Sequence, residues 1–145
     1  MRKPKPTEYG DYATWVSFDV MANYQVRLIF TNDLVKSATA RIAAPSPDGD
    51  AFCYHVKGDG RSYIFLKFDS DESTVAHECW HIVHRVLTYC GVQDMDDEIV
   101  AYHLDHMVEK VYQFKNAIKS STKKEVQNDD NGRTGSKAAN KTRNR

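Results

Sequence analysis

Alternating apolar and polar residues mark the first half of the chain as strand-forming. Thr14–Val20 and Tyr24–Thr31 alternate with a period of two and are rich in β-branched and aromatic residues, a pattern typical of β-strands. Ala51–Lys57 and Ser62–Phe68 have a similar composition. The segment GDGR between them, with Asp59–Gly60 as the turn signal, predicts a hairpin.

A short helix is expected between these two pairs of strands. Asn32–Asp33 is a helix-capping pair, and Leu34–Ile42 follows it as the predicted helix. The first half therefore predicts a small twisted sheet of about four strands, mixed or antiparallel, with one inserted helix.

Two long helices are predicted for the second half, which gives an α+β fold class overall. Ser70–Thr74 offers capping residues and early acidic residues for a helix that continues to Cys90. Gly91 stands where a left-handed C-terminal cap belongs. Another helix is expected to open in the acidic cluster at Asp94 and to run to about Ala117.

Charge divides the chain into three parts, although its 145 residues include 20 basic and 20 acidic ones. We interpret residues 1–11 as a basic arm, 12–118 as one folded domain, and 119–145 as a basic tail. The tail is expected to be disordered because it has almost no large apolar residue. Positions 7–118 contain nine basic and seventeen acidic residues, so the two ends balance an acidic body. Such a body is a poor nucleic-acid surface, and only weak, non-specific contact through the tail is expected.

The sequence predicts a cytoplasmic protein. No apolar run approaches the roughly 20 residues of a membrane span, and no apolar stretch follows the basic residues at the start, as it would in a secretory signal. Cys53, Cys79 and Cys90 are an odd number in no metal-binding spacing, which fits a reducing compartment better than a disulfide scaffold.

The motif that carries chemistry is His77-Glu78-Cys79-Trp80-His81, an HExxH sequence inside the first long helix. Four residues make about one turn, so both imidazoles project from one face and can converge on one metal ion. Zinc held by two histidines needs a third protein ligand and an open position for water. Glu78, at the flank of that face, could take a proton from the water and deliver it to a leaving amine.

The helix separates its histidines from its apolar residues. Val75, Cys79, Ile82, Val83, Val86, Leu87 and Cys90 share a core face, while His77, His81 and His84 form a separate stripe. Trp80 lies between the two faces and is expected to pack beneath the metal site. The alternative to metal binding is a solvated polar face with scattered histidines.

Several residues compete for the position of third ligand. Glu98 lies 17 residues after His81 and would return beside the first helix in an antiparallel pair, unless the connection loops wider. His103 and His106 on the second helix come next. His84 is the last choice because it lies too far along the axis from the first histidine of the motif.

At this point the chain resembles a known family. HECWH, followed after one turn by DDEIVAY, is similar to the zincin metallopeptidases of the gluzincin type, particularly the small ones with a minimal core. The sequence VAHECWHIVHRVL…GV…DDEIVAYHLDHMVEKV, preceded by YQVRLIFTNDLVKSATAR, also resembles small predicted metallopeptidases of tailed bacteriophages. The similarity covers roughly residues 12–116.

The resemblance implies a zincin-like fold and a role for each motif residue. His77, His81 and Glu98 fall on the family's ligand positions for a zinc ion (Zn2+), and Glu78 falls on the general base. Tyr102 faces the same way as Glu98 and could donate a hydrogen bond to a developing oxyanion, with a structural role as the alternative. The implied activity is zinc-dependent hydrolysis of a peptide bond.

In zincins an edge strand of the sheet lies along the cleft, and extended peptides add to it by backbone hydrogen bonds. Ser62–Phe68 is the candidate here, and a purely structural core strand is the alternative. The expected substrate is one or a few host or phage proteins in an infected bacterium.

The rival interpretation is a metal-stabilised binding module, weak in catalysis, that docks a host or phage protein along its edge strand. Glu78 argues against it, because a purely structural metal site requires only ligands. Longer gluzincins carry a substrate-binding domain after the active-site helices, and this chain has the polar tail there, which favours the module. A nucleic-acid-associated protein acting through the tail is a third, weaker interpretation.

Overall fold

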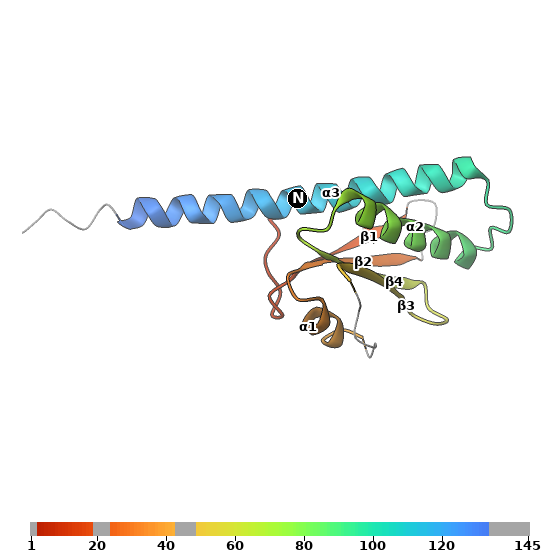
Figure 1. Ribbon diagram of the computed structural model, residues 1–145, viewed down its shortest axis with the longest axis horizontal. Coiled ribbons are helices and arrows are strands. Elements are labelled where there is room, and N and C mark those ends of the chain that lie inside the picture. Colours follow the sequence, from red (N-terminus) through yellow and green to blue (C-terminus); the bar gives the residue numbers. More distant parts are fainter. Residues whose placement is uncertain (1–2, 19–23, 43–48, 134–145) are drawn as a thin grey trace, which may run out of the picture.

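The structure, a computed structural model, has an α+β architecture and describes residues 3–18, 24–42 and 49–133. Its elements follow one another along the chain (Figure 1): β1 (Tyr12–Ser17), β2 (Gln25–Thr31), α1 (Leu34–Thr39), β3 (Ala51–His55), β4 (Arg61–Lys67), α2 (Glu72–Tyr89) and α3 (Asp97–Arg133). The predicted order of four strands, one inserted helix and two long helices is confirmed.

The four strands form one mixed sheet in the order β1-β2-β4-β3. β1 pairs antiparallel with β2, β2 pairs parallel with β4, and β4 pairs antiparallel with β3. The hairpin between β3 and β4 is confirmed, with His55 directly opposite Ser62. Its connection closes through the Val56 amide, which donates to the Arg61 carbonyl, and Gly58 has the left-handed backbone at φ 74°.

The strand predicted to lie at the edge of the sheet is an interior strand. β4, which contains most of the predicted segment Ser62–Phe68, pairs on both sides, so that β1 and β3 are the edges. The physical reason lies in its consecutive buried residues Ile64, Phe65 and Leu66, which face both sides of the sheet. Such a run belongs to a strand covered on both faces.

Helices cover both faces of the sheet (Figure 1). α2 and α3 lie on one face and α1 lies on the other. The alternation of β2 serves both layers, because Leu28 and Phe30 join the core under α2 and α3, while Ile29 joins the smaller cluster under α1. That cluster is completed by Leu34, Ala38, Ile42 and Phe65.

α3 is longer than predicted. It begins at Asp97 and continues to Arg133, so its C-terminal part projects beyond the sheet (Figure 1), instead of ending near Ala117. Residues 119–133 are therefore helical where a disordered tail was expected, while residues 134–145 lie outside the described part. Extending an existing helix is cheap compared with nucleating one, and no glycine or proline occurs between the start of α3 at Asp97 and Gly132.

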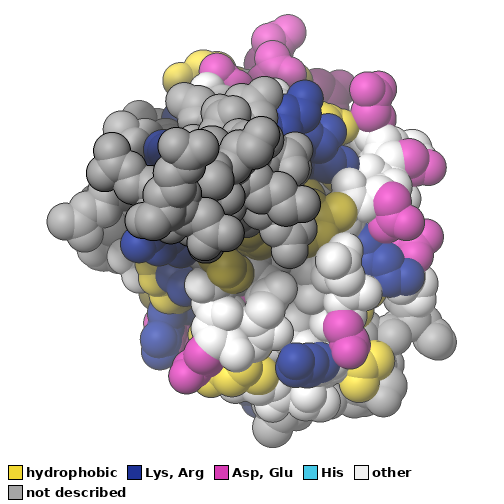
Figure 2. Space-filling model, turned by 90° about the vertical axis from the view of Figure 1, so that its left-hand side faces the viewer, with side chains coloured by type: hydrophobic (Ala, Val, Ile, Leu, Met, Phe, Trp, Pro, Cys, Tyr) yellow, Lys and Arg dark blue, Asp and Glu magenta, His cyan; other side chains and the backbone are white. Residues whose placement is uncertain are grey.

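The end of the molecule from which α3 projects carries both signs of charge. Figure 2 shows lysine and arginine side chains together with aspartate and glutamate side chains across the coloured, described part of this face. This mixture differs from the single-sign surface that electrostatic binding of nucleic acid uses.

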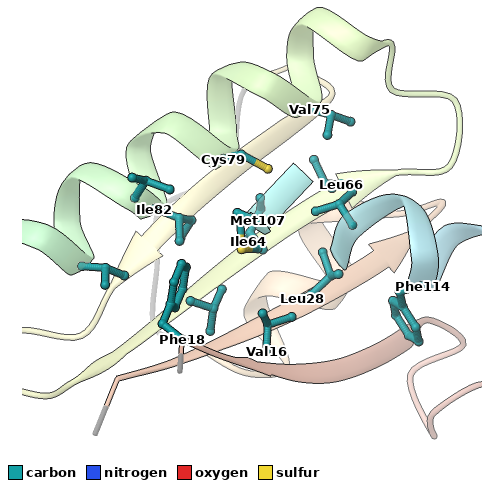
Figure 3. Packing of buried hydrophobic residues seen from close by; sticks show 14 of the residues in the cluster. Val16, Phe18, Leu28, Ile64, Leu66, Val75, Cys79, Ile82, Met107 and Phe114 are labelled. Carbon is teal, nitrogen blue, oxygen red and sulfur yellow. The ribbon is translucent and has the colours of Figure 1, made fainter. Parts of the chain in front are cut away.

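The main core lies between the sheet and the two long helices (Figure 3). α2 directs Val75, Cys79 and Ile82 towards the strands. α3 completes the core with Met107 and Phe114. The apolar face predicted for α2 is confirmed, because the predicted residues other than Cys90 are buried.

Both ends of α2 follow the capping signals in the sequence. The Asp71 carboxylate accepts from the Thr74 amide at 2.7 Å and caps the N-terminus. At the C-terminus, Gly91 has φ +77°, its amide donates to the Thr88 carbonyl, and the Val92 amide donates to the Leu87 carbonyl. This is the Schellman arrangement, in which a left-handed glycine ends the helix.

A buried ion pair anchors the chain before β1 to the segment that directly follows α1. Arg41 donates from both terminal nitrogens to the fully buried Asp11 carboxylate, each at 2.6 Å, and the hydroxyls of Ser37 and Thr7 also donate to it. The segment from Thr7 to Asp11, predicted to belong to a basic arm, is therefore part of the fold. Burial by itself would raise the pKa of the Asp11 carboxyl, but the hydrogen bonds from Arg41, Ser37 and Thr7 hold this pKa below its ordinary value.

We expect Asp11→Asn to lower the free energy of unfolding by about 3 kcal/mol, because Arg41 would lose its buried anionic partner. Since the folded pKa is lowered, the contribution of Asp11 is present above the unfolded pKa, about 3.9, and is lost as the pH falls through the folded pKa. Denaturant titrations at several pH values measure both effects. Arg61→Ala, which breaks the exposed pair with Asp59, is the matched control and should cost less than about 1 kcal/mol. Equal costs for the two variants would contradict the prediction.

Candidate functional site

The two histidines of the HExxH motif meet on the exposed face of α2. Their Nε2 atoms are 3.1 Å apart and their rings are nearly perpendicular, with centroids separated by 4.6 Å. Two imidazole nitrogens bound tetrahedrally to one zinc ion at about 2.1 Å would be about 3.4 Å apart. The predicted convergence of His77 and His81 is thus present, and their spacing fits two ligands of one ion.

A third ligand does not join this pair. Among the residues that the structure describes, no three His, Cys, Asp or Glu side chains are grouped so that they could hold a metal ion. Glu98 is exposed in the first turn of α3, where its backbone amide donates to Asp96. The wide connection between α2 and α3 (Figure 1) explains this position. The connection begins after Tyr89, which lies eight residues, or about 12 Å, beyond His81 along α2.

The other predicted ligands also have neighbours of their own. The His84 ring lies 4.5 Å from the Trp80 ring. His103 is buried, and both it and His106 lie against Phe18, at 6.0 and 5.6 Å between ring centroids. These histidines are thus placed by aromatic contacts.

Glu78 lies on the side of α2 that faces the sheet edge. It is only 9% exposed, while both histidines beside it are exposed. Its neighbour is Cys53 of β3, whose thiol donates to the Glu78 carbonyl oxygen at 3.3 Å. Glu78 therefore lies against β3, where its charge acts on the Cys53 thiol, while the two imidazoles of the motif are exposed.

Trp80 and Tyr102 are more exposed than their predicted roles suggest. Trp80 is 43% exposed and lies edge-on to His81, so it flanks the pair instead of packing beneath it. Tyr102 is 70% exposed, and its ring lies 5.4 Å from that of His103. It lines a shallow hollow along α3 together with Asp105, His106, Val108 and Glu109. Within the described residues, no hydrogen bond or ring contact joins Tyr102 to His77 or His81.

His55 is a site residue that the sequence analysis missed. It ends β3, is half-buried, and its Nδ1 is hydrogen-bonded to the Ser62 hydroxyl at 2.7 Å. Burial lowers the pKa of His55, and the nearby positive charges of Arg85 and His81 lower it further. The sequence signal that could have indicated His55 was one polar residue, His55 or Ser62, in each of two otherwise apolar strands. Only the tertiary fold brings these two residues beside α2.

Cys53 and Cys79 are free thiols in the core layer, as was expected for Cys79. Burial raises the pKa of Cys79 to about 12, and the charge of Glu78 adds to this shift. The pKa of Cys53 is also raised by burial and by Glu78. Both side chains therefore remain protonated and act as small hydrophobic groups.

Comparison of the chain with protein-family models, with curated proteins and with solved structures finds no match. The assignment of a function therefore rests on the residues and their geometry. In the described part of the chain, none of the helices has the length and apolar character that crossing a membrane requires.

In the native protein, we expect iodoacetamide at mildly alkaline pH to modify Cys90, which is exposed, much faster than Cys53 or Cys79. Mass spectrometry of the digested protein measures the labelling of each cysteine. The denatured protein is the control and should be labelled at all three positions. Rapid labelling of Cys53 or Cys79 in the folded state would contradict their assignment to the core.

Proposed function

We propose that this protein is a zinc-dependent peptidase with a zincin-like fold of the gluzincin type. The single observation that carries the proposal is the His77–His81 pair, whose Nε2 atoms are 3.1 Å apart with Glu78 beside them. The arrangement of α2 next to the antiparallel edge strand β3 supports the zincin-like fold. We further propose that it is phage-encoded and acts in the bacterial cytoplasm on one or a few proteins.

His77 and His81 would hold the zinc ion, and Glu98 is the proposed third protein ligand. Both imidazoles are exposed and contact each other through Nε2, the nitrogen that each would offer to the metal. Glu98 is exposed at the start of α3 and follows directly on the connection from α2. The donor set of two imidazoles and one carboxylate is one that zinc accepts.

The proton transfers of the reaction would be carried out by a side chain close in sequence to the His77–His81 pair. When bound, zinc supplies Lewis acidity, polarising a carbonyl and making a water molecule more acidic. Glu78 would accept a proton from the attacking water and would pass it to the amine that leaves. Its low exposure shields this proton from bulk solvent.

The substrate backbone would lie along β3. This strand pairs with β4 on one side and, within the described residues, with no strand on its other side. Its unpaired amides and carbonyls can accept an extended peptide as an additional strand. This proposal moves the docking edge from Ser62–Phe68, an interior segment, to Ala51–His55, which is also the strand nearest Glu78.

The same open edge supports the alternative proposal, a metal-stabilised binding module that is weak in catalysis. In that case β3 would dock an intact host or phage protein, and Glu78 would have no essential role.

Metal content tests the shared premise of both proposals. After zinc-supplemented expression, the wild-type protein should contain about one zinc ion per chain and His81→Ala should lose it, because a single imidazole is left from the motif. His84→Ala is the matched control, since this histidine contacts Trp80 one turn further along, and it should retain the metal. Glu98→Ala should weaken zinc binding. A wild-type protein without metal, measured by inductively coupled plasma mass spectrometry, would overturn both proposals.

Glu78→Gln separates the enzyme from the module. We expect this variant to bind zinc like the wild type while cleavage falls by about 100- to 10,000-fold, because the amide cannot accept the proton. Proteome-wide sequencing of new N-termini in cells that express either form measures this difference. If no cleavage depends on Glu78 while partner proteins still co-purify, the binding module is the correct description.

A further inference from the structure

A hydrogen-bond chain runs from the core to His55, beside the candidate metal site. Ser62 of β4 stands at its centre, with its hydroxyl bonded to the Tyr24 hydroxyl on one side and to His55 Nδ1 on the other. Ser62 and Tyr24 are buried, so water does not compete for these hydrogen bonds. The register between β3 and β4 fixes the hydrogen bond between Ser62 and His55, because the two residues are directly opposite each other.

The direction of the protons along this chain follows from the burial of Tyr24. The Tyr24 hydroxyl is shielded from water, so its proton needs an acceptor within the protein. Among the described residues, the acceptor in contact with that hydroxyl is Ser62 Oγ.

Ser62 then has one proton left to donate, and His55 Nδ1 is its partner. Nδ1 must accept, so the neutral imidazole carries its proton on Nε2. The chain from Tyr24 through Ser62 to His55 thus selects one tautomer of the histidine.

The Nε2–H group of His55 is available to a ligand. Within the described residues it has no hydrogen-bond partner, and no buried side-chain nitrogen or oxygen lacks a partner there, so Nε2 is open to solvent. His55 also lies close enough to His81 and Arg85 for their charges to act on it. An oriented N–H donor therefore lies at the end of β3, two residues along the strand from Cys53, whose thiol contacts the backbone carbonyl of Glu78 in the motif.

Resting on the proposed function, we infer that His55 is a further catalytic residue. Its Nε2–H donates a hydrogen bond to the carbonyl oxygen of a peptide bond lying along β3 as that oxygen gains negative charge. The proton stays on His55 throughout, while Glu78 moves the proton of the attacking water. Ser62 and Tyr24 are positioning residues, because they act by fixing the tautomer and orientation of His55.

This role differs from that of a third metal ligand. Nδ1 is occupied by Ser62, and a protonated Nε2 offers no lone pair to a metal. The role also differs from that of Tyr102, which was assigned the same hydrogen bond by sequence but is exposed on α3 with its ring against His103.

The tautomer is tested without any activity measurement. Nitrogen-15 NMR of the histidine side chains near neutral pH should show His55 of the wild type protonated on Nε2. In Ser62→Ala, His55 should become a mixture of tautomers. His84, which is outside the chain, is the internal control and should be unaffected. A His55 protonated on Nδ1 in the wild type would overturn the inference.

The catalytic role is tested with zinc-loaded protein and a mixture-based library of quenched fluorescent peptides. We expect His55→Ala to keep its zinc and to lose about 100- to 1,000-fold in kcat with little change in KM, the usual cost of removing an oxyanion donor. His55→Gln, which restores a side-chain N–H, should recover part of the rate. Tyr24→Phe leaves the imidazole in place and should reduce kcat less than His55→Ala does.

The outcomes separate this inference from the proposed function. If His55→Ala cleaves the library like the wild type, the role of His55 is wrong and the peptidase proposal stands. If His55→Ala loses zinc, His55 is a ligand and the inference is also wrong. A zinc-loaded wild type that cleaves nothing would reject the proposed function and the catalytic role together, while the NMR result would still decide the tautomer. If His55→Ala does not fold, the same comparison is made between Tyr24→Phe and the wild type.

Discussion

The packing of α2 against the sheet is the constraint on which the candidate site depends. Its buried stripe, from Val75 to Leu87, fixes the rotation of the helix about its axis. With that rotation set, the residues one turn apart on the opposite face, His77 and His81, can only point outward and towards each other. Glu78, about 100° around the helix from His77, is then turned towards the edge of the sheet. The geometry of the site is thus a result of the hydrophobic core.

The strand order has an equally direct effect. Placing β4 inside the sheet makes β3 its edge, next to α2, and puts Ser62 where it is buried between two polar partners. Because Ser62 is buried, its hydroxyl can accept a hydrogen bond from one partner and donate one to the other without competition from water. The same pairing that completes the core therefore connects Tyr24 to His55 through the Ser62 hydroxyl.

Local features were predictable from the sequence because they depend on local periodicity. The His77–His81 pair follows from a spacing of four on a helix, and the end of α2 follows from Gly91. Non-local features could not be predicted from the sequence. Whether Ser62–Phe68 lies inside or at the edge of the sheet depends on pairing with β2, about 35 residues earlier. The distance of Glu98 from the histidines depends on the path of a connection that has no repeating pattern.

The length of α3 has a consequence for how unfolding is distributed along one continuous helix. Among the residues whose side chains are described, Ile118 is the last buried one, and the helix continues fifteen residues beyond it to Arg133. The backbone amides near Met107 can exchange with solvent only when the core opens, whereas those of the projecting turns are protected by helical hydrogen bonds alone. Amide exchange should therefore accelerate steeply after Ile118. A single helix thus combines a segment as stable as the whole domain with one that opens and closes independently of it.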